Sequence, residues 1–181
     1  MVSDNKSELR KIIKQKRTEL PVEENSRIIC EKIKNLNCYK EAENILMYSP
    51  LPFETNTKFL LTDDKKKFYL PRVNGDELEI CPYISDENCT KNKWGILEPK
   101  CKAIEDLSII DTAIIPALCA DKKGYRLGYG KGYYDRFLPK LKETCKKIIP
   151  ISEELVFDSI PVNETDICCN MIITQRNVIY I

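Results

Sequence analysis

The feature that most constrains the fold is a short apolar run in the second half of the chain. Residues 108–116 read Ser-Ile-Ile-Asp-Thr-Ala-Ile-Ile-Pro, so an aspartate and a threonine interrupt the apolar side chains before a proline ends the run. A strand buried on both faces of a parallel sheet has this composition, whereas a half-exposed strand alternates apolar and polar residues. The run therefore predicts a strand that is buried inside a parallel sheet.

Other segments supply the helices and strands that such a sheet needs. Apolar residues at helical spacing predict two helices, at 7–20 and 22–36, with Pro21 between them. The remaining expected elements are a helical turn at 57–61, a helix at 133–141, buried strands at 44–48, 147–151 and 171–174, strands at 67–71 and 77–83, and an edge strand at 177–181. Residues 86–102 are expected to be irregular, and a loop is expected from 117 to 132. This alternation predicts a single α/β layered domain over 1–181, with a mainly parallel central sheet flanked by helices.

The chain of 181 residues contains no histidine. This absence excludes Ser-His-Asp and Cys-His catalysis, HExxH zinc sites and proton transfer by an imidazole. Any bound ion is therefore expected to be a hard cation held by carboxylate oxygens.

Cysteine usage and charge bear on the compartment and the partners. Nine cysteines are scattered without a CxxC pair, and the charged, polar N-terminus lacks the pattern of a secretory signal. Because an odd number of thiols risks mispairing in an oxidising compartment, we expect a cytoplasmic protein. No apolar run approaches the ~20 residues of a membrane span, and a formal net charge of +1 gives no bulk attraction to nucleic acid or membranes. The expected partner is a small molecule, and the expected state is a monomer.

The densest functional signal lies between Gly124 and Asp135, where glycines occupy positions 128, 130 and 132. A glycine loop that enters a helix presents free N–H groups at the positive end of the helix dipole, and such a loop can bind phosphate. Lys131 and Arg126 add positive charge, and Asp135 could hold Mg²⁺. The segment is neither a Walker A loop nor a GxGxxG motif, so an ordinary turn explains the pattern equally well. Its place after a buried strand favours a ligand site.

The sequence RLGYGKGYYDRFL at 126–138 resembles the signature of the 5-formyltetrahydrofolate cyclo-ligase family, and residues 115–124 resemble the family's approach to that signature. Shorter similarities follow in the expected order, at 6–10, 48–57, 70–73, 95–99 and 161–166. Ala117 and Ala120 stand where the family usually has glycine and phenylalanine. The resemblance therefore extends over nearly the whole chain.

The resemblance implies an enzyme that uses ATP and Mg²⁺ to convert 5-formyltetrahydrofolate to 5,10-methenyltetrahydrofolate, ADP and phosphate. Phosphorylation of the formyl oxygen makes the formyl carbon electrophilic and turns its oxygen into a leaving group, after which folate N10 attacks. Such a reaction needs positioning and charge stabilisation, and it needs no histidine.

The resemblance also implies roles for individual residues. Lys131 and Arg126 are the implied catalytic cations, and Asp135 and Asp166 are the implied Mg²⁺ ligands. The implied nucleotide contacts are Lys6, Ser7, Glu8, Leu9, Arg10, Arg126, Leu127, Gly128, Tyr129, Gly130, Lys131, Gly132, Tyr133 and Tyr134. The implied folate contacts are Ser49, Glu54, Tyr129, Gly130, Lys131, Gly132 and Tyr133.

Alternative interpretations remain open for the residues and for the whole chain. Lys6 and Arg10 could form a solvated basic face, and Glu54 could be a surface acid. Asp135 could cap a helix or pair with Arg136, and Asp166 could stabilise a turn or cap a helix. Trp94 could pack in the core or flank the pterin. Arg72 and Glu98 receive no chemical role. The functional alternatives are a non-catalytic nucleotide- or RNA-binding module and a sugar-phosphate isomerase or acyl-transferase on a similar scaffold.

Overall fold

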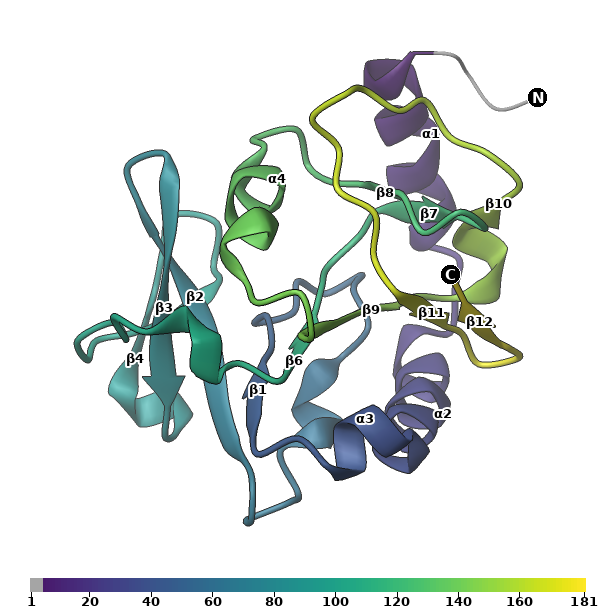
Figure 1. Cartoon of the computed structure of the whole chain (residues 1–181). Coiled ribbons are helices and arrows are strands. Elements are labelled where there is room, and N and C mark those ends of the chain that lie inside the picture. Colours follow the sequence, from purple (N-terminus) through teal and green to yellow (C-terminus); the bar gives the residue numbers. More distant parts are fainter. Residues whose placement is uncertain (1–4) are drawn as a thin grey trace.

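Helices cover both faces of a central sheet in the computed structural model, which describes residues 5–181 (Figure 1). Within this range the four α-helices are α1 (Lys6–Arg17), α2 (Val22–Asn35), α3 (Asn37–Lys40) and α4 (Tyr133–Phe137). Short 3₁₀ turns lie at Thr57–Leu60, Asp86–Asn88, Leu107–Ile109, Leu138–Lys140 and Glu153–Leu155. The expected pair of N-terminal helices is confirmed, although both end one to three residues earlier than the sequence suggests.

Local signals explain where α1 begins and which face it buries. The side chain of Asn5 caps the helix by accepting a hydrogen bond from the backbone N–H of Ser7 at 2.8 Å. Leu9 and Ile13, four residues apart, lie against the core, and basic residues fill the last turn. The helix therefore has one apolar face and ends in a cluster of positive charge.

Seven strands form the central sheet in the order β12-β11-β9-β6-β1-β2-β3. Their bounds are β1 Asn44–Leu46, β2 Lys67–Asn74, β3 Glu77–Tyr83, β6 Thr112–Ile114, β9 Lys146–Pro150, β11 Met171–Ile173 and β12 Val178–Tyr180. The five inner strands run parallel, and the edge strands β12 and β3 pair antiparallel with their neighbours. The predicted mainly parallel sheet and the predicted C-terminal edge strand are both confirmed.

Successive residues of the inner strands face opposite layers, as the pleat of a sheet requires. Leu46 packs in the cluster that α1 and α4 complete, whereas its neighbour Ile45 packs in the cluster under α2 and α3. In β6, Ala113 and Ile114 divide in the same way. Burial on both faces is the physical reason for the apolar run at 108–116.

The expectation of a plain loop from 117 to 132 is wrong. This stretch contains β7 (Cys119–Asp121) and β8 (Arg126–Leu127), which form a small second sheet with β10 (Val156–Phe157). The buried carboxylate of Asp121 accepts hydrogen bonds from the backbone N–H groups of Lys123 and Tyr125 and so shapes the turn between β7 and β8. Strands of two or three residues are too short to show a period of two, so the sequence gives no sign of them.

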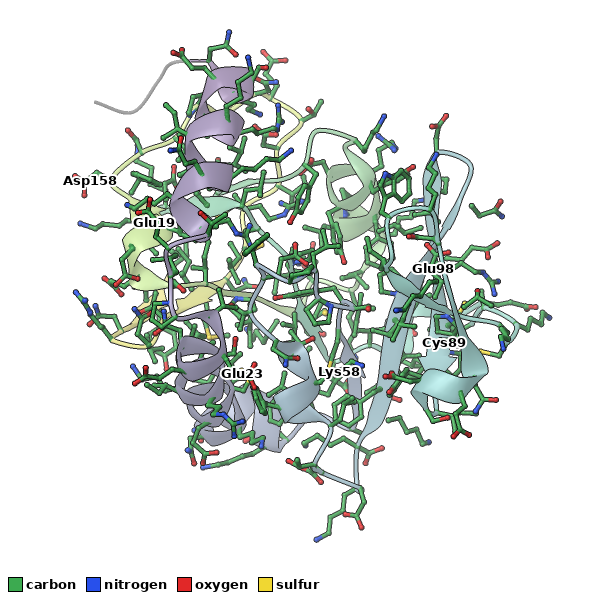
Figure 2. All side chains as sticks on the ribbon, turned by 180° about the vertical axis from the view of Figure 1, so that it is seen from behind. Glu19, Glu23, Lys58, Cys89, Glu98 and Asp158 are labelled. Atoms are coloured by element: carbon green, nitrogen blue, oxygen red, sulfur yellow. The ribbon has the colours of Figure 1, made fainter. Side chains whose placement is uncertain are left out.

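Two further expectations need correction. Residues 86–102 are not wholly irregular, because β4 (Cys89–Lys91) and β5 (Leu97–Pro99) form a hairpin. Glu98 and Cys89 mark this hairpin in Figure 2, beside the long strands β2 and β3. The helix expected at 133–141 stops at Phe137 and continues as a 3₁₀ turn that contains Pro139, which has no N–H to donate. The strand expected at 108–116 is also shorter, because Leu107–Ile109 forms a 3₁₀ turn before β6.

Two further features concern residues 5–181 as a whole. No helix within residues 5–181 is long and apolar enough to cross a membrane. All nine cysteines are free thiols, and six of them are buried.

Candidate active site

The carboxyl ends of β1 and β6 form the topological switch point of the sheet. The two strands are parallel neighbours, but β2 lies beyond β1 on one side, whereas β9 and β11 lie beyond β6 on the other. Ligands of open α/β sheets bind in the crevice at such a point. The segment after β1 carries Ser49 and Glu54, and the segment after β6 leads through β7 and β8 to the glycine loop, defined here as residues 128–132.

Backbone N–H groups along the glycine loop are available to a ligand. Within the described part of the chain, the N–H groups of residues 128–135 donate no hydrogen bond to protein atoms. Gly130 and Gly132 have positive φ values of 98° and 68°, a conformation that glycine adopts without strain. The Lys131 side chain is exposed, and its ammonium has no partner among residues 5–181. Free amides beside a free cation make this loop suited to an anion.

Helix α1 lies directly against this loop. The Arg10 Nε atom donates to the carbonyl oxygen of Gly128 at 2.8 Å, and its guanidinium lies so close to Gly130 that a Cβ there would be 3.2 Å from Cζ. Ser7 and Glu8 are exposed in the first turn, whereas the Leu9 side chain points into the core. The structure thus brings the predicted 6–10 segment and the predicted loop together across 118 positions of sequence.

Arg126 and Asp135 form a partly buried ion pair. Arg126 Nη2 lies 2.9 Å from Asp135 Oδ1, and the two side chains are 4% and 28% exposed. Arg126 Nη1 also donates to the carbonyl oxygen of Ile167 at 3.0 Å. The partner of Asp135 is therefore Arg126 rather than Arg136. Because its guanidinium is turned inward, Arg126 ties α4 to the C-terminal segment, and its catalytic role stays a prediction.

Asp166, the second predicted Mg²⁺ ligand, lies beside the start of α1. It forms an ion pair with Lys6 and accepts a hydrogen bond from the backbone N–H of Asn163 at 2.6 Å. Arg126 links the two predicted ligands, since it contacts Asp135 and the residue after Asp166. Among residues 5–181, no group of three or more histidine, cysteine, aspartate or glutamate residues is arranged to hold a metal. Two hard carboxylates nevertheless suit Mg²⁺, which is commonly held by one or two carboxylates together with substrate phosphates.

Glu54 lies at the switch point and is only 5% exposed. Its carboxylate accepts hydrogen bonds from the backbone N–H of Leu51 at 2.8 Å and from the hydroxyl of Tyr129 at 2.9 Å. Burial raises the pKa of Glu54, and these two hydrogen bonds and the charge of Arg17 oppose that rise. The surface-acid interpretation of Glu54 is wrong, because the side chain is buried and contacts the glycine loop.

Ser49 joins the β4–β5 hairpin to this region, whereas Trp94 contacts residues of the hairpin itself. The Ser49 hydroxyl oxygen accepts a hydrogen bond from the backbone N–H of Leu97 at 3.2 Å. Trp94, at the tip of the hairpin, is 45% exposed and stacks under the Lys93 ammonium, so the core interpretation of this residue is wrong. Arg72 holds the hairpin base through the carbonyl oxygens of Pro99 and Cys101 and carries the structural role that the sequence left open.

The two adjacent tyrosines of α4 point in different directions. Tyr134 packs edge-on against Phe137 with ring centroids 6.5 Å apart, and burial raises the pKa of its phenol. Tyr133 lies under the Arg136 guanidinium, and its hydroxyl donates to the carbonyl oxygen of Gly75 in the β2–β3 turn at 3.4 Å. The Tyr133 side chain therefore contacts the β2–β3 turn, whereas the Tyr134 ring packs inward.

Comparison with known proteins places this chain in a family. A model described as the 5-formyltetrahydrofolate cyclo-ligase family matches residues 2–175. The chain belongs to this family. A cyclo-ligase from Haemophilus influenzae is 31% identical, with 81% of each chain covered. A probable cyclo-ligase from Schizosaccharomyces pombe is 30% identical, with 77% of this chain and 74% of that one covered.

Solved structures from the cyclo-ligase family share the fold. The 5,10-methenyltetrahydrofolate synthetase of Aquifex aeolicus superposes with a TM-score of 0.85 at 31% identity, over 97% of this chain and 92% of that one. A synthetase from Mycoplasma pneumoniae superposes with a TM-score of 0.75 at 26% identity, over 94% and 99% of the two chains. The α/β fold with a mainly parallel sheet is thus that of cyclo-ligases.

One buried charge in this family member was missed by the sequence analysis. Arg17, at the end of α1, is 4% exposed and donates hydrogen bonds to the carbonyl oxygens of Phe53 and Ala117. These carbonyls follow β1 and β6, so Arg17 spans the switch point. A weak signal existed, because Arg17 lies seven residues after Arg10 and hence on the same helix face.

A separate hollow lies at the opposite end of the sheet. It has a volume of about 690 Å³ and is lined by residues at the amino end of β2 and the carboxyl end of β3, among them Lys67, Phe68 and Tyr83. None of the predicted site residues lines it. Ligands of parallel sheets gather at the carboxyl ends of the strands, so the switch point remains the candidate active site.

Proposed function

We propose that this protein catalyses the ATP-dependent cyclisation of 5-formyltetrahydrofolate to 5,10-methenyltetrahydrofolate, with release of ADP and phosphate. Family membership supports cyclo-ligase activity in general. The specific proposal rests on the backbone N–H groups of residues 128–135, which donate to no protein atom among residues 5–181, and on the Lys131 ammonium and the Arg10 guanidinium beside them. Such a surface suits an anion and supports the binding of a triphosphate here.

In this proposal the chain's own residues bind and orient the two substrates. The backbone amides of the glycine loop, Lys131 and Arg10 hold the phosphates, and the γ-phosphoryl group passes to the formyl oxygen as its bond to ADP breaks. The folate N10 lone pair then attacks the formyl carbon, and the phosphate leaves with the former formyl oxygen and the N10 proton. Charge on the transferring group is met by fixed donors, which is the main contribution that proteins make to phosphoryl transfer.

Glu54 is proposed to recognise the folate. An ionised carboxylate accepts hydrogen bonds and donates none, so it suits the N–H groups at the edge of a pteridine ring. The buried position of Glu54 beside Tyr129 supports recognition of the folate next to the glycine loop. Ser49, Gly130 and Tyr133 are proposed to complete the folate contacts.

Asp135 and Asp166 are proposed to hold Mg²⁺ together with the phosphates. When bound, Mg²⁺ would neutralise negative charge on the phosphates. In the structure Asp135 pairs with Arg126 and Asp166 pairs with Lys6, so a bound Mg²⁺ would compete with these two cations for the carboxylates. We also propose a cytoplasmic, monomeric enzyme, which the nine free thiols support as far as a reducing compartment is concerned.

One assay tests the proposal. Purified protein is mixed with MgATP and 5-formyltetrahydrofolate, and the ultraviolet absorbance of the methenyl product is followed beside a reaction without ATP. ATP-dependent product formation is expected. Nucleotide binding without turnover would instead support the non-catalytic binding module, and turnover that needs no ATP would support an isomerase or an acyl-transferase.

A further inference from the structure

Arg17 is a charged side chain in an unusual position. It is 4% exposed, and within the described residues it forms no ion pair. Burying a charge is costly unless hydrogen bonds or an opposite charge compensate it. Arg17 Nε donates to the Phe53 carbonyl oxygen at 2.8 Å, Nη2 donates to the same oxygen, and Nη1 donates to the Ala117 carbonyl oxygen at 3.1 Å.

These contacts fix the backbone on both sides of the switch point. Phe53 immediately precedes Glu54, so the two-pronged contact at Phe53 sets the position from which the Glu54 carboxylate projects. Ala117 lies in the segment that leads from β6 to β7. A planar guanidinium can hold both carbonyls at once because its donors point in fixed directions, which an ammonium cannot reproduce.

The same helix holds the nucleotide side of the site. Arg10 contacts the Gly128 carbonyl oxygen, and Arg17 contacts the loop of Glu54 two helical turns later. Since an α-helix rises about 1.5 Å per residue, the two contacts are roughly 10 Å apart along one rigid element. Helix α1 therefore sets the distance between the loop that would bind phosphate and the acid that would bind folate.

We propose that Arg17 is a positioning residue that fixes the position of Glu54 relative to the glycine loop, so that the folate is aligned with the transferring phosphoryl group. The inference rests on the proposed function and adds to it a residue outside the motifs that carried the resemblance. Arg17 does not touch the reacting atoms, and it acts through the backbone of residues 53 and 117 and through its charge.

The charge of Arg17 also acts on Glu54. The ionisable groups that face Glu54 are Arg17 from α1, Tyr48 after β1, Tyr129 from the glycine loop and Tyr134 from α4. Arg17 is the cation among them, and its charge lowers the pKa of Glu54 against the effect of burial. Geometry and charge can therefore be separated by two substitutions at the same position.

The test compares Arg17→Lys and Arg17→Gln with the wild-type protein, varying each substrate in turn and measuring kcat/KM against pH. Arg17→Lys keeps the positive charge but loses the planar guanidinium that donates to both carbonyls. The KM for 5-formyltetrahydrofolate should therefore rise about tenfold or more, while the KM for ATP changes less than about twofold. Arg17→Gln loses the charge as well, so the acidic limb of the pH profile should move to higher pH, whereas Arg17→Lys should leave that limb in place.

Arg27→Gln is the matched control, because it removes an exposed arginine from α2 and should leave both KM values and the pH profile unchanged. Equal increases in both KM values, or unchanged kinetics per folded molecule with a lower melting temperature, would overturn the proposal. If Arg17→Gln does not fold, Arg17→Lys alone decides through the ratio of the two KM values. If the wild-type protein makes no product, the proposed function fails, and a titration of 5-formyltetrahydrofolate without ATP still decides whether Arg17 supports folate binding.

Discussion

Substitution of Gly124 offers the sharpest test of how the C-terminal segment packs against the turn that precedes the glycine loop. Its φ is +88°, and a Cβ added there would lie 2.6 Å from the Cys169 carbonyl oxygen, 2.8 Å from Cys168 Sγ and 2.9 Å from Ile181 Cγ1. The Gly124 carbonyl oxygen also accepts a hydrogen bond from the Cys169 N–H at 2.9 Å. The paired cysteines, to which the sequence assigned no role, are thus the surface that Gly124 fits against.

Gly75 in the β2–β3 turn is a matched control for Gly124→Ala. Its φ is +59°, but a Cβ there meets nothing within 4 Å. Left-handed backbone costs an L-residue ~1–2 kcal/mol, and the lower entropy of the unfolded chain returns ~0.5 kcal/mol, so Gly75→Ala should cost about 1 kcal/mol. Gly124→Ala adds an overpacking cost of ~2 kcal/mol and should cost about 3 kcal/mol in total. At ~2–4 °C per kcal/mol for a chain of this length, the two melting temperatures should differ by ~4–8 °C.

Thermal unfolding followed by far-ultraviolet circular dichroism measures this difference directly. Gly124→Ala should also weaken activity, because Asp166 and Ile167 directly precede the displaced cysteines. Equal melting temperatures for the two variants would refute the reasoning, since they would mean that the close contact at Gly124 costs nothing beyond backbone strain.

Three further predictions concern the proposed active site. Lys131→Ala should lower kcat/KM by about 100-fold. Its melting temperature should not change, because the ammonium is exposed and has no partner among the described residues. As a control, Lys65→Ala at the far end of the sheet should change neither quantity. Asp135→Asn should raise the Mg²⁺ concentration needed for half-maximal rate and lower the melting temperature, because buried Arg126 loses its partner; an unchanged Mg²⁺ titration would contradict the ligand role. Burial raises the pKa of Glu54, so the folded state binds this proton more tightly than the unfolded state does. Its stability contribution is present at acid pH and lost as pH rises through the raised pKa, and kcat/KM should fall as pH drops through it; an acidic limb that persists in Glu54→Gln would assign the limb to another group.

Elements with strong local signals were predictable. Each of these signals is local, because it can be read from a single short segment of the chain. They are the helical period of α1 and α2, the apolar composition of β6 and β9, and the glycines at 128, 130 and 132. The strands β7, β8 and β10 were not predictable, because two or three residues carry no period and these strands form only by pairing with one another. The 3₁₀ turn before β6 was missed because its apolar residues read as a continuation of the strand.

The amino-acid sequence alone is enough to assign the layered α/β class, to locate the glycine loop and to exclude histidine chemistry. Which side chains meet follows from the tertiary structure. Arg17 contacts a carbonyl 36 positions away, Tyr129 contacts Glu54 75 positions away, and Arg10 contacts Gly128 118 positions away. Periodicity and composition report how each segment is buried, whereas the order of strands in the sheet determines which loops meet at its carboxyl edge.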